Sequence, residues 1–412
     1  ATVSAAVLLA GLAACSSGDG DRATSASTTT ASPTSSTDGG PTTTAIDRPD
    51  GPAATFDHEL PAGAPFLGET RDPGLEAAGY VQHEYEVTGT AASYRSEGAF
   101  PKDGRFELTA GDEQGDYRTR VLVRRPADAA DFNGTVLVEW LNVSGGLDAD
   151  PVYSYTRDEL LRGGYAWVGV SAQKIGIEGG PTAVALPSIS DALAGKGLTG
   201  SDPARYGDLS HPGDAFAYDL FTQVARALRA DGGGDGVLYG AAPDRLLAVG
   251  ESQSAFALTT YVDGVQPLTR AFDGFLLHSR GGAPLPLGEP GGATDIAAAV
   301  GGDPVAIRTD LDVPVFMLQS ETDLVSLIGF APARQDDTDR IRTWEVAGTA
   351  HADTTLLGPV ADTLTCGAPV NHGPMVIVAP TALHHLDAWV RDGTEPPHGT
   401  PIELTADGAA VA

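Results

Sequence analysis

Cysteine and positive charge are both scarce in this sequence. Its 412 residues include two cysteines and 25 Lys plus Arg, against 55 Asp plus Glu, for a formal net charge of −30. Two cysteines cannot form a multi-disulfide scaffold, and no Cys or His pair has the spacing of zinc ligands, so we expect neither a metal nor another cofactor. The negative charge repels phosphate backbones and anionic headgroups, which disfavours nucleic acid partners and electrostatic binding to membranes.

The first cysteine lies in a segment typical of exported proteins. An apolar run of small residues, 5–14, is too short to span a bilayer but has the length of a signal-peptide core. The run leads into Leu12-Ala13-Ala14-Cys15, which resembles the bacterial lipobox. The resemblance implies that 1–15 belong to a signal peptide whose charged leader lies upstream, and that Cys15 carries a lipid. We therefore expect an extracytoplasmic protein that reaches the bacterial cell membrane only through this lipid anchor.

The next segment, 16–52, is rich in Ser, Thr, Gly, Asp, Ala and Pro and contains almost no large apolar residue. Such a segment cannot bury enough surface to offset the entropy of ordering its chain. As a random coil of about 36 residues it would span roughly 30–36 Å. We interpret it as a disordered tether to a single domain at 53–412, in which Cys366 is an unpaired thiol with no assigned role.

The rest of the chain alternates between strand-like and helix-like runs. Two early runs, 80–87 and 117–123, alternate polar and apolar residues as antiparallel edge strands do. Later strand-like runs are continuously apolar, as in strands buried on both faces: 135–140, 166–170, 246–249, 275–277 and 315–318, before a last strand at 341–346. Helical patterns fall at 153–162, 215–230, 252–262 and 376–391. This order predicts an α/β fold with a mainly parallel sheet and helices on both faces, whose ligand site lies at the carboxyl ends of the strands.

One serine follows a buried strand in a sterically special context. The strand 246–249 leads through Gly250-Glu-Ser252-Gln-Ser254 into a helix. In a nucleophile elbow the serine stands on a strained turn, and the residues two positions away on either side must be small. Gly250 and Ser254 meet this demand, although the second position usually holds glycine. We predict that Ser252 is a nucleophile; the competing interpretation is an ordinary helix N-cap serine.

A serine nucleophile needs a base, and a carboxylate that orients the base. In this type of fold the three follow in the order Ser, acid, His. The strand 315–318 precedes Gln319-Ser-Glu-Thr-Asp323, and the strand 341–346 precedes Ala347-Gly-Thr-Ala-His351. We predict Asp323 as the acid and His351 as the base, with Glu321 as the alternative acid. Among the other histidines only His278 ends a buried strand, and no acid follows it in the right order.

Acyl transfer to a serine also needs N–H donors for the developing oxyanion. The backbone N–H of Gln253, directly after Ser252, is the first candidate. The second is expected from the loop after the strand 135–140, Leu141-Asn-Val-Ser-Gly-Gly146, where Val143 or Asn142 would present its backbone N–H.

From about residue 80 to 397 the chain resembles the α/β-hydrolase superfamily, and more narrowly a bacterial secreted subgroup called alpha/beta hydrolase domain proteins. The matching stretches are the elbow and 167–174, 202–214, 319–323, 370–374 and 389–397. The resemblance implies the α/β-hydrolase fold, an esterase-like activity, and a catalytic triad of Ser252, Asp323 and His351. Two long segments at the carboxyl edge, 175–214 and 281–312, would be lid-like insertions or plain surface loops.

Together these features predict a membrane-tethered, extracytoplasmic serine hydrolase. It would cleave carboxylic esters, of small-molecule or lipid-like substrates, through an acyl-enzyme. An acyltransferase or a peptidase could use the same three residues, and a ligand-binding lipoprotein could keep the fold without turnover.

Overall fold

The computed structural model describes residues 47–63, 70, 72, 74–183, 195–234, 236–325, 327–364, 368–406, 408 and 410–412. The signal segment, Cys15, most of the tether and Cys366 lie outside these ranges. The described end of the predicted tether contacts the domain, where Arg48 pairs with Asp273. The domain boundary placed after residue 52 stays a prediction. None of the helices in these ranges has the length and apolar character needed to span a bilayer.

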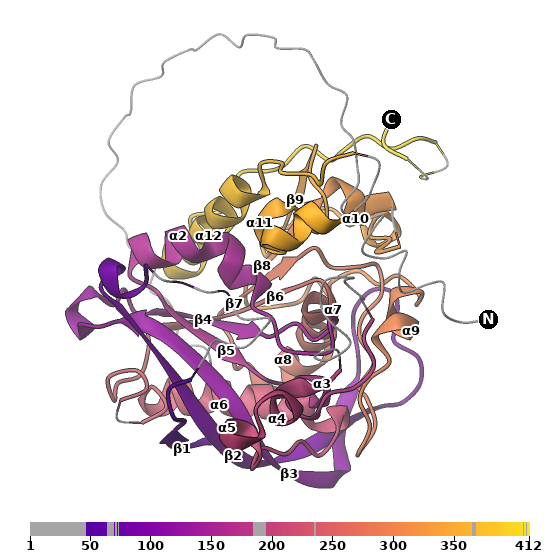
Figure 1. Ribbon diagram of the computed structural model, residues 1–412. Helices are drawn as coiled ribbons and strands as arrows, with labels where there is room; N and C mark the ends of the chain where they lie inside the picture. Colours follow the sequence, from indigo (N-terminus) through magenta and orange to yellow (C-terminus); the bar gives the residue numbers. More distant parts are fainter. Residues whose placement is uncertain are drawn as a thin grey trace, which may run out of the picture.

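The core of the described structure is one nine-stranded sheet (Figure 1). From one edge to the other its strands are β1 (Thr55–Glu59), β2 (Tyr80–Ser96), β3 (Leu108–Pro126), β5 (Ala166–Val170), β4 (Thr135–Trp140), β6 (Arg245–Glu251), β7 (Gly274–His278), β8 (Val315–Ser320) and β9 (Ile341–Val346). The strands from β5 to β9 pair in parallel, whereas β1, β2, β3 and β5 pair antiparallel. The mainly parallel sheet is as predicted, and its carboxyl ends meet at one edge.

The antiparallel strands are longer than their sequence pattern indicates. β2 and β3 pair from Tyr80 opposite Pro126 as far as Ser96 opposite Leu108, well beyond the predicted runs 80–87 and 117–123. The alternation of polar and apolar residues fades there, and Asp219 from the helical layer holds the strand by accepting from the Ala92 N–H at 2.8 Å. The short β1 was not predicted because nearly all of its residues are exposed and carry no pattern.

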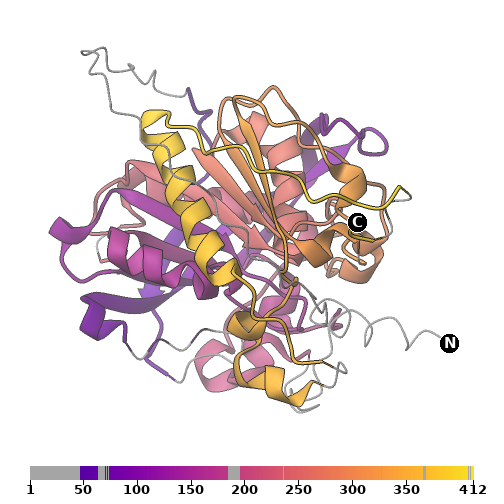
Figure 2. The same ribbon diagram turned by 90° about the horizontal axis from the view of Figure 1, so that it is seen from above.

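Helices cover both faces of the sheet (Figures 1 and 2). One face packs against α2 (Pro151–Gly163) and α12 (Met375–Asp392), the other against α6 (Ala217–Asp231), α7 (Gln253–Thr260) and α8 (Gln266–Thr269). A π-helical turn, Tyr261–Val265, joins α7 to α8. The shorter α-helices are α3 (Lys174–Glu178), α4 (Gly197–Ser201), α5 (Pro203–Tyr206), α9 (Ile296–Val300), α10 (Glu321–Val325) and α11 (Thr354–Leu357). Within the described ranges, 3-10 segments span Glu76–Ala78, Ala129–Asp131, Asp214–Phe216, Ala331–Ala333 and Gly358–Thr363.

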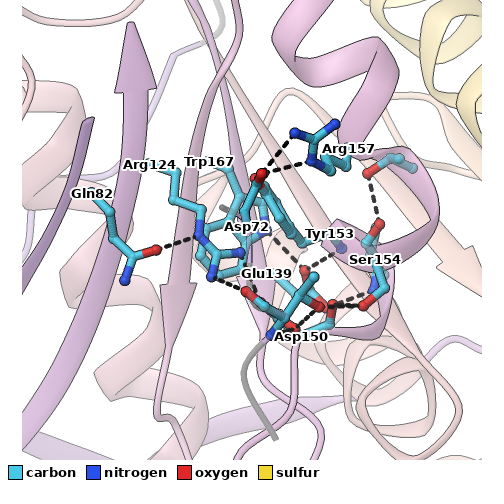
Figure 3. Close-up of polar contacts among 12 residues, drawn as sticks. Asp72, Gln82, Arg124, Glu139, Asp150, Tyr153, Ser154, Arg157 and Trp167 are labelled. Carbon is cyan, nitrogen blue, oxygen red and sulfur yellow. Dashed lines mark hydrogen bonds and ion pairs between the residues drawn. The ribbon is translucent and has the colours of Figure 1, made fainter. Parts of the chain in front are cut away.

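A buried carboxylate from the sheet fixes the start of helix α2 (Figure 3). Glu139 on β4 accepts from the N–H groups of Val152 and Tyr153, at 2.9 and 3.0 Å, and from the Trp167 indole N–H at 2.8 Å. The first N–H groups of a helix have no partner within it, so Glu139 takes the place of an N-cap side chain. Burial and the neighbouring charge of Asp150 raise the pKa of Glu139 well above its usual range, against these hydrogen bonds.

The two predicted insertions contact each other. The Asp214 N–H donates to the Gly292 carbonyl oxygen at 2.9 Å, and the Asp214 carboxylate accepts from the Thr294 N–H at 2.7 Å. These contacts link 175–214 to 281–312 at a residue that is 1% exposed. Whether the pair covers a bound substrate remains a prediction.

Candidate active site

Strand β6 and helix α7 meet at a strained serine. Ser252 has φ 55° and ψ −122°, in the left-handed region that a residue with a Cβ rarely occupies. A Cβ on Gly250 would come within 3.0 Å of the Ser254 carbonyl carbon, which explains the small residue there. The Ser252 side chain makes no capping hydrogen bond to α7, so the structure does not support the N-cap interpretation.

Ser254 contributes more than its small size. Its hydroxyl accepts from the Glu251 N–H at 3.0 Å and donates to the Glu251 carbonyl oxygen at 2.8 Å. A glycine could make neither contact. The serine that departs from the usual elbow pattern therefore ties the end of β6 to the first turn of α7.

Three predicted residues from three strand ends form one hydrogen-bonded chain. The His351 Nε2 lies 2.8 Å from the Ser252 Oγ, and the His351 Nδ1 lies 2.7 Å from the Asp323 Oδ1. Because a carboxylate only accepts, Nδ1 carries a proton, and in the neutral imidazole Nε2 accepts from the Ser252 hydroxyl. The Ser320 N–H donates to the Asp323 Oδ2 at 2.6 Å, which fixes the carboxylate. The arrangement can remove the serine proton in one step.

The surrounding charges shift the pKa values of His351 and Asp323. Burial lowers the pKa of His351, but the Asp323 charge and hydrogen bond, with a further contribution from Glu251, raise it to about 9. Burial raises the pKa of Asp323, yet the His351 charge and hydrogen bond outweigh it and the net shift is downward. Asp323 is thus ionised and His351 is a stronger base than an ordinary histidine.

The alternative acid, Glu321, points elsewhere. Its Oε2 accepts from the Gly348 N–H at 2.9 Å, in the loop that leads to His351, and no contact joins it to the imidazole. The choice of Asp323 over Glu321 is therefore the one that the geometry favours.

The predicted second oxyanion donor is not available in this structure. The Val143 N–H donates to the Gln253 side-chain Oε1 at 3.0 Å, and the Asn142 N–H donates to the Ala149 carbonyl oxygen at 2.9 Å. Both candidates are thus hydrogen-bonded within the protein. The Gln253 N–H stands at the first position of α7, where a helix offers it no acceptor, and it remains the first candidate.

The Gln253 side chain was missed by the sequence analysis. Besides holding Val143, its Nε2 donates to the Gln173 Oε1 at 2.6 Å, which also accepts from the Trp140 indole N–H at 2.9 Å. Gln173 is therefore a buried structural residue here. No sequence signal marks such a network, because it depends on which side chains the loops bring together.

Four further polar side chains close to Ser252, His351 and Asp323 were not assigned a role by the sequence: Glu251, Asp353, Tyr155 and His278. The Asp353 Oδ1 accepts from the Tyr155 hydroxyl at 2.9 Å, and the Tyr155 ring meets the His278 ring edge to face at 5.2 Å. Burial lowers the pKa of His278 to about 4, so this histidine is neutral at pH 7. In the part of the chain that the structure describes, no three His, Cys, Asp or Glu side chains are grouped so as to hold a metal ion.

The sheet order, the elbow and the strand-end residues define the α/β-hydrolase class. The chain belongs to the alpha/beta hydrolase domain family, whose model matches residues 41–412. No curated protein matches the sequence. Among solved structures, it is similar to an alpha-beta serine hydrolase homologue from Coxiella burnetii, with 11% identity over 66% of this chain and 92% of the other, and a TM-score of 0.35.

Two fungal proteins are similar at the same level. One is from a study of two Rhizomucor miehei esterases, with 13% identity, 74% and 84% coverage of the two chains, and a TM-score of 0.36. The other is carboxyl esterase 2 from Tuber melanosporum, with 12% identity, 65% and 82% coverage, and a TM-score of 0.34. These are similarities of fold and carry no argument about the substrate.

Proposed function

We propose that this α/β hydrolase is a serine hydrolase that cleaves carboxylic esters through an acyl-enzyme, outside the cytoplasm and tethered to the membrane. One observation carries the catalytic part of the proposal. Ser252 stands on a strained elbow with its Oγ 2.8 Å from an imidazole that a buried carboxylate orients. Strain and alignment of this kind cost stability, and they are typical of a nucleophile.

The proposed reaction has two stages. In the first, the Ser252 Oγ attacks the ester carbonyl carbon while its proton passes to the His351 Nε2, and the Gln253 N–H donates to the oxyanion. His351 then gives this proton to the leaving alcohol as the carbon–oxygen bond breaks, which leaves an acyl-enzyme. In the second stage His351 takes a proton from water, whose oxygen attacks the acyl carbon. His351 then returns this proton to the Ser252 Oγ as the bond between Oγ and the acyl carbon breaks, and the carboxylic acid leaves.

A fluorophosphonate probe tests the nucleophile directly. The parent protein should be labelled in a one-to-one ratio and should hydrolyse p-nitrophenyl acetate, and Ser252→Ala should lose both labelling and turnover. Loss of the nucleophile removes covalent catalysis, so only a residual rate from binding is expected. Labelling that persists in Ser252→Ala, or a parent that neither reacts with the probe nor hydrolyses any ester in a graded panel, would reject the proposal. The second result would favour the ligand-binding lipoprotein instead.

The tether rests on Cys15 and can be tested separately in cells. A precursor that carries the whole exported sequence should incorporate labelled fatty acid and fractionate with the membrane. Cys15→Ser removes the thiol that accepts the lipid, so the protein should lose the label and leave the membrane fraction. A single acyl chain anchors only weakly, so stable attachment implies more than one chain on this residue. Unchanged membrane attachment of Cys15→Ser would contradict the anchor.

A further inference from the structure

The residue before the proposed nucleophile brings a second carboxylate to His351. The Glu251 Oε1 lies 3.8 Å from the His351 Nε2, the same nitrogen that contacts the Ser252 Oγ. The Glu251 side chain is 3% exposed, and its Oε1 has no hydrogen-bond partner. A buried carboxylate oxygen without a partner is costly, because it has lost its hydration and gained nothing in exchange.

Apart from His351, no positive group among the described residues compensates this carboxylate. The charged and titratable groups around Glu251 are His351, Asp323, Asp353, Tyr155 and His278. Asp323 and Asp353 are like charges that raise the pKa of Glu251, and His351 is the group that lowers it. Burial raises the pKa of Tyr155 well above its usual range, and burial lowers that of His278, so both rings are neutral at pH 7. Among the described residues around it, an imidazolium at position 351 is thus the favourable partner of Glu251.

We propose that Glu251 is a positioning residue of this site, whose charge beside Nε2 stabilises the imidazolium that forms when Ser252 gives up its proton. The inference rests on the proposed function, since it assumes that His351 is the general base. Asp323 at Nδ1 and Glu251 near Nε2 then flank the cation from both ends of the ring. A buried charge pair at this distance is worth far more than the same pair in water.

The second carboxylate has two opposite effects on the rate. It makes His351 a stronger base, and so raises the rate at which enzyme molecules with a neutral imidazole react. It also keeps His351 protonated to higher pH, which moves the pH at which the free enzyme gains its base further into the alkaline range. Burial first, and then the two acidic neighbours, raise the pKa of Glu251 itself to about 8, despite the His351 charge. The carboxylate form of Glu251 is therefore populated mainly above this pH, where the two groups titrate as a coupled pair.

The test compares pH profiles of kcat/KM, from pH 6 to 10.5, with a neutral ester as substrate. In Glu251→Gln the acidic limb should move down by about one to three pH units, because an opposite charge within about 4–6 Å shifts a pKa by this amount. The alkaline plateau should fall, since the base is weaker, so the two profiles should cross. Glu251→Asp keeps the negative charge, so the acidic limb of its profile should stay at alkaline pH.

Glu321→Gln is the matched control, because it makes the same change at the same edge of the sheet on a carboxylate that contacts Gly348 instead of the imidazole. Its profile should coincide with that of the parent. If Glu251→Gln lowers activity by the same factor at every pH, or leaves the limb in place, Glu251 is only structural and the inference is wrong. Thermal unfolding of each variant checks that the compared proteins are folded.

A titration of His351 by NMR, with ¹⁵N-labelled histidine and His351→Asn for assignment, separates this inference from the proposed function. The pKa of His351 should fall in Glu251→Gln whether or not an ester is turned over. An unchanged His351 titration in a protein whose turnover requires Ser252 rejects the inference alone. A parent without turnover or labelling rejects the proposed function, even where the shift of His351 is observed.

Discussion

Two carboxylates two residues apart differ completely in what they contact. Asp323 is fully buried, with one oxygen on His351 and the other on the Ser320 N–H. Glu321 accepts from the Gly348 N–H and supports only the backbone of the loop. A helix, α10, begins at Glu321 and turns the third position toward the imidazole, so the difference follows from the direction in which the chain leaves β8.

Asp323→Asn should therefore lower kcat by about 10⁴-fold, because an amide at this place favours the wrong tautomer of His351. The pKa of His351 should also fall from about 9, since the Asp323 charge and hydrogen bond that raise it are removed. Steady-state kinetics with a neutral ester, together with the pH profile, measures both effects. A kcat near that of the parent would show that Asp323 does not orient the base.

At the level of residues, the sequence predicted side chains better than backbone donors. Ser252, Asp323 and His351 could be found because each follows a predicted strand in a fixed order. The N–H of Val143 could not be judged in the same way, since its partner, the Gln253 side chain, is 110 positions away along the chain. Glu251 was visible in the elbow motif, but its burial and its missing partner appear only when α7 and the His351 loop are in place.

At the level of elements, the buried parallel strands were the most predictable. β4 and β5 begin and end where their apolar runs do, because a strand covered on both faces must be apolar along its whole length. The edge strand β9, which is only partly buried, also has the predicted bounds. The extensions of β2 and β3 and all of β1 were missed, since exposed strands depend on pairing more than on composition. Helix α2 illustrates the same limit, because its N-terminus is fixed by Glu139, which lies within a strand.

At the scale of the whole molecule, the structure explains where the few positive charges are. Several of the arginines are inside the protein, paired with carboxylates: Arg120 with Glu84 and Asp148, Arg124 with Asp150, and Arg342 with Asp337 and Glu395. Each of these guanidinium groups is at most 2% exposed. Arg120 and Arg124 thus neutralise buried carboxylates, whereas the partners of Arg342 are partly exposed, and the surface is left with most of the net charge of −30.

This distribution should select substrates by charge. A surface of one sign attracts opposite charges and repels like charges over about 30 Å at 0.01 M salt, but only over about 3 Å at 1 M. We expect kcat/KM at 0.01 M salt to be higher for an ester with a trimethylammonium group than for a matched ester with a carboxylate, by about tenfold or more. The ratio should fall toward one at 1 M salt, while a neutral ester of the same size changes little. Stopped-flow or initial-rate assays of the three esters at both salt concentrations measure this. A ratio that does not depend on salt would show that the net charge does not reach the site, and any preference would then come from groups such as Glu251 that are buried beside His351.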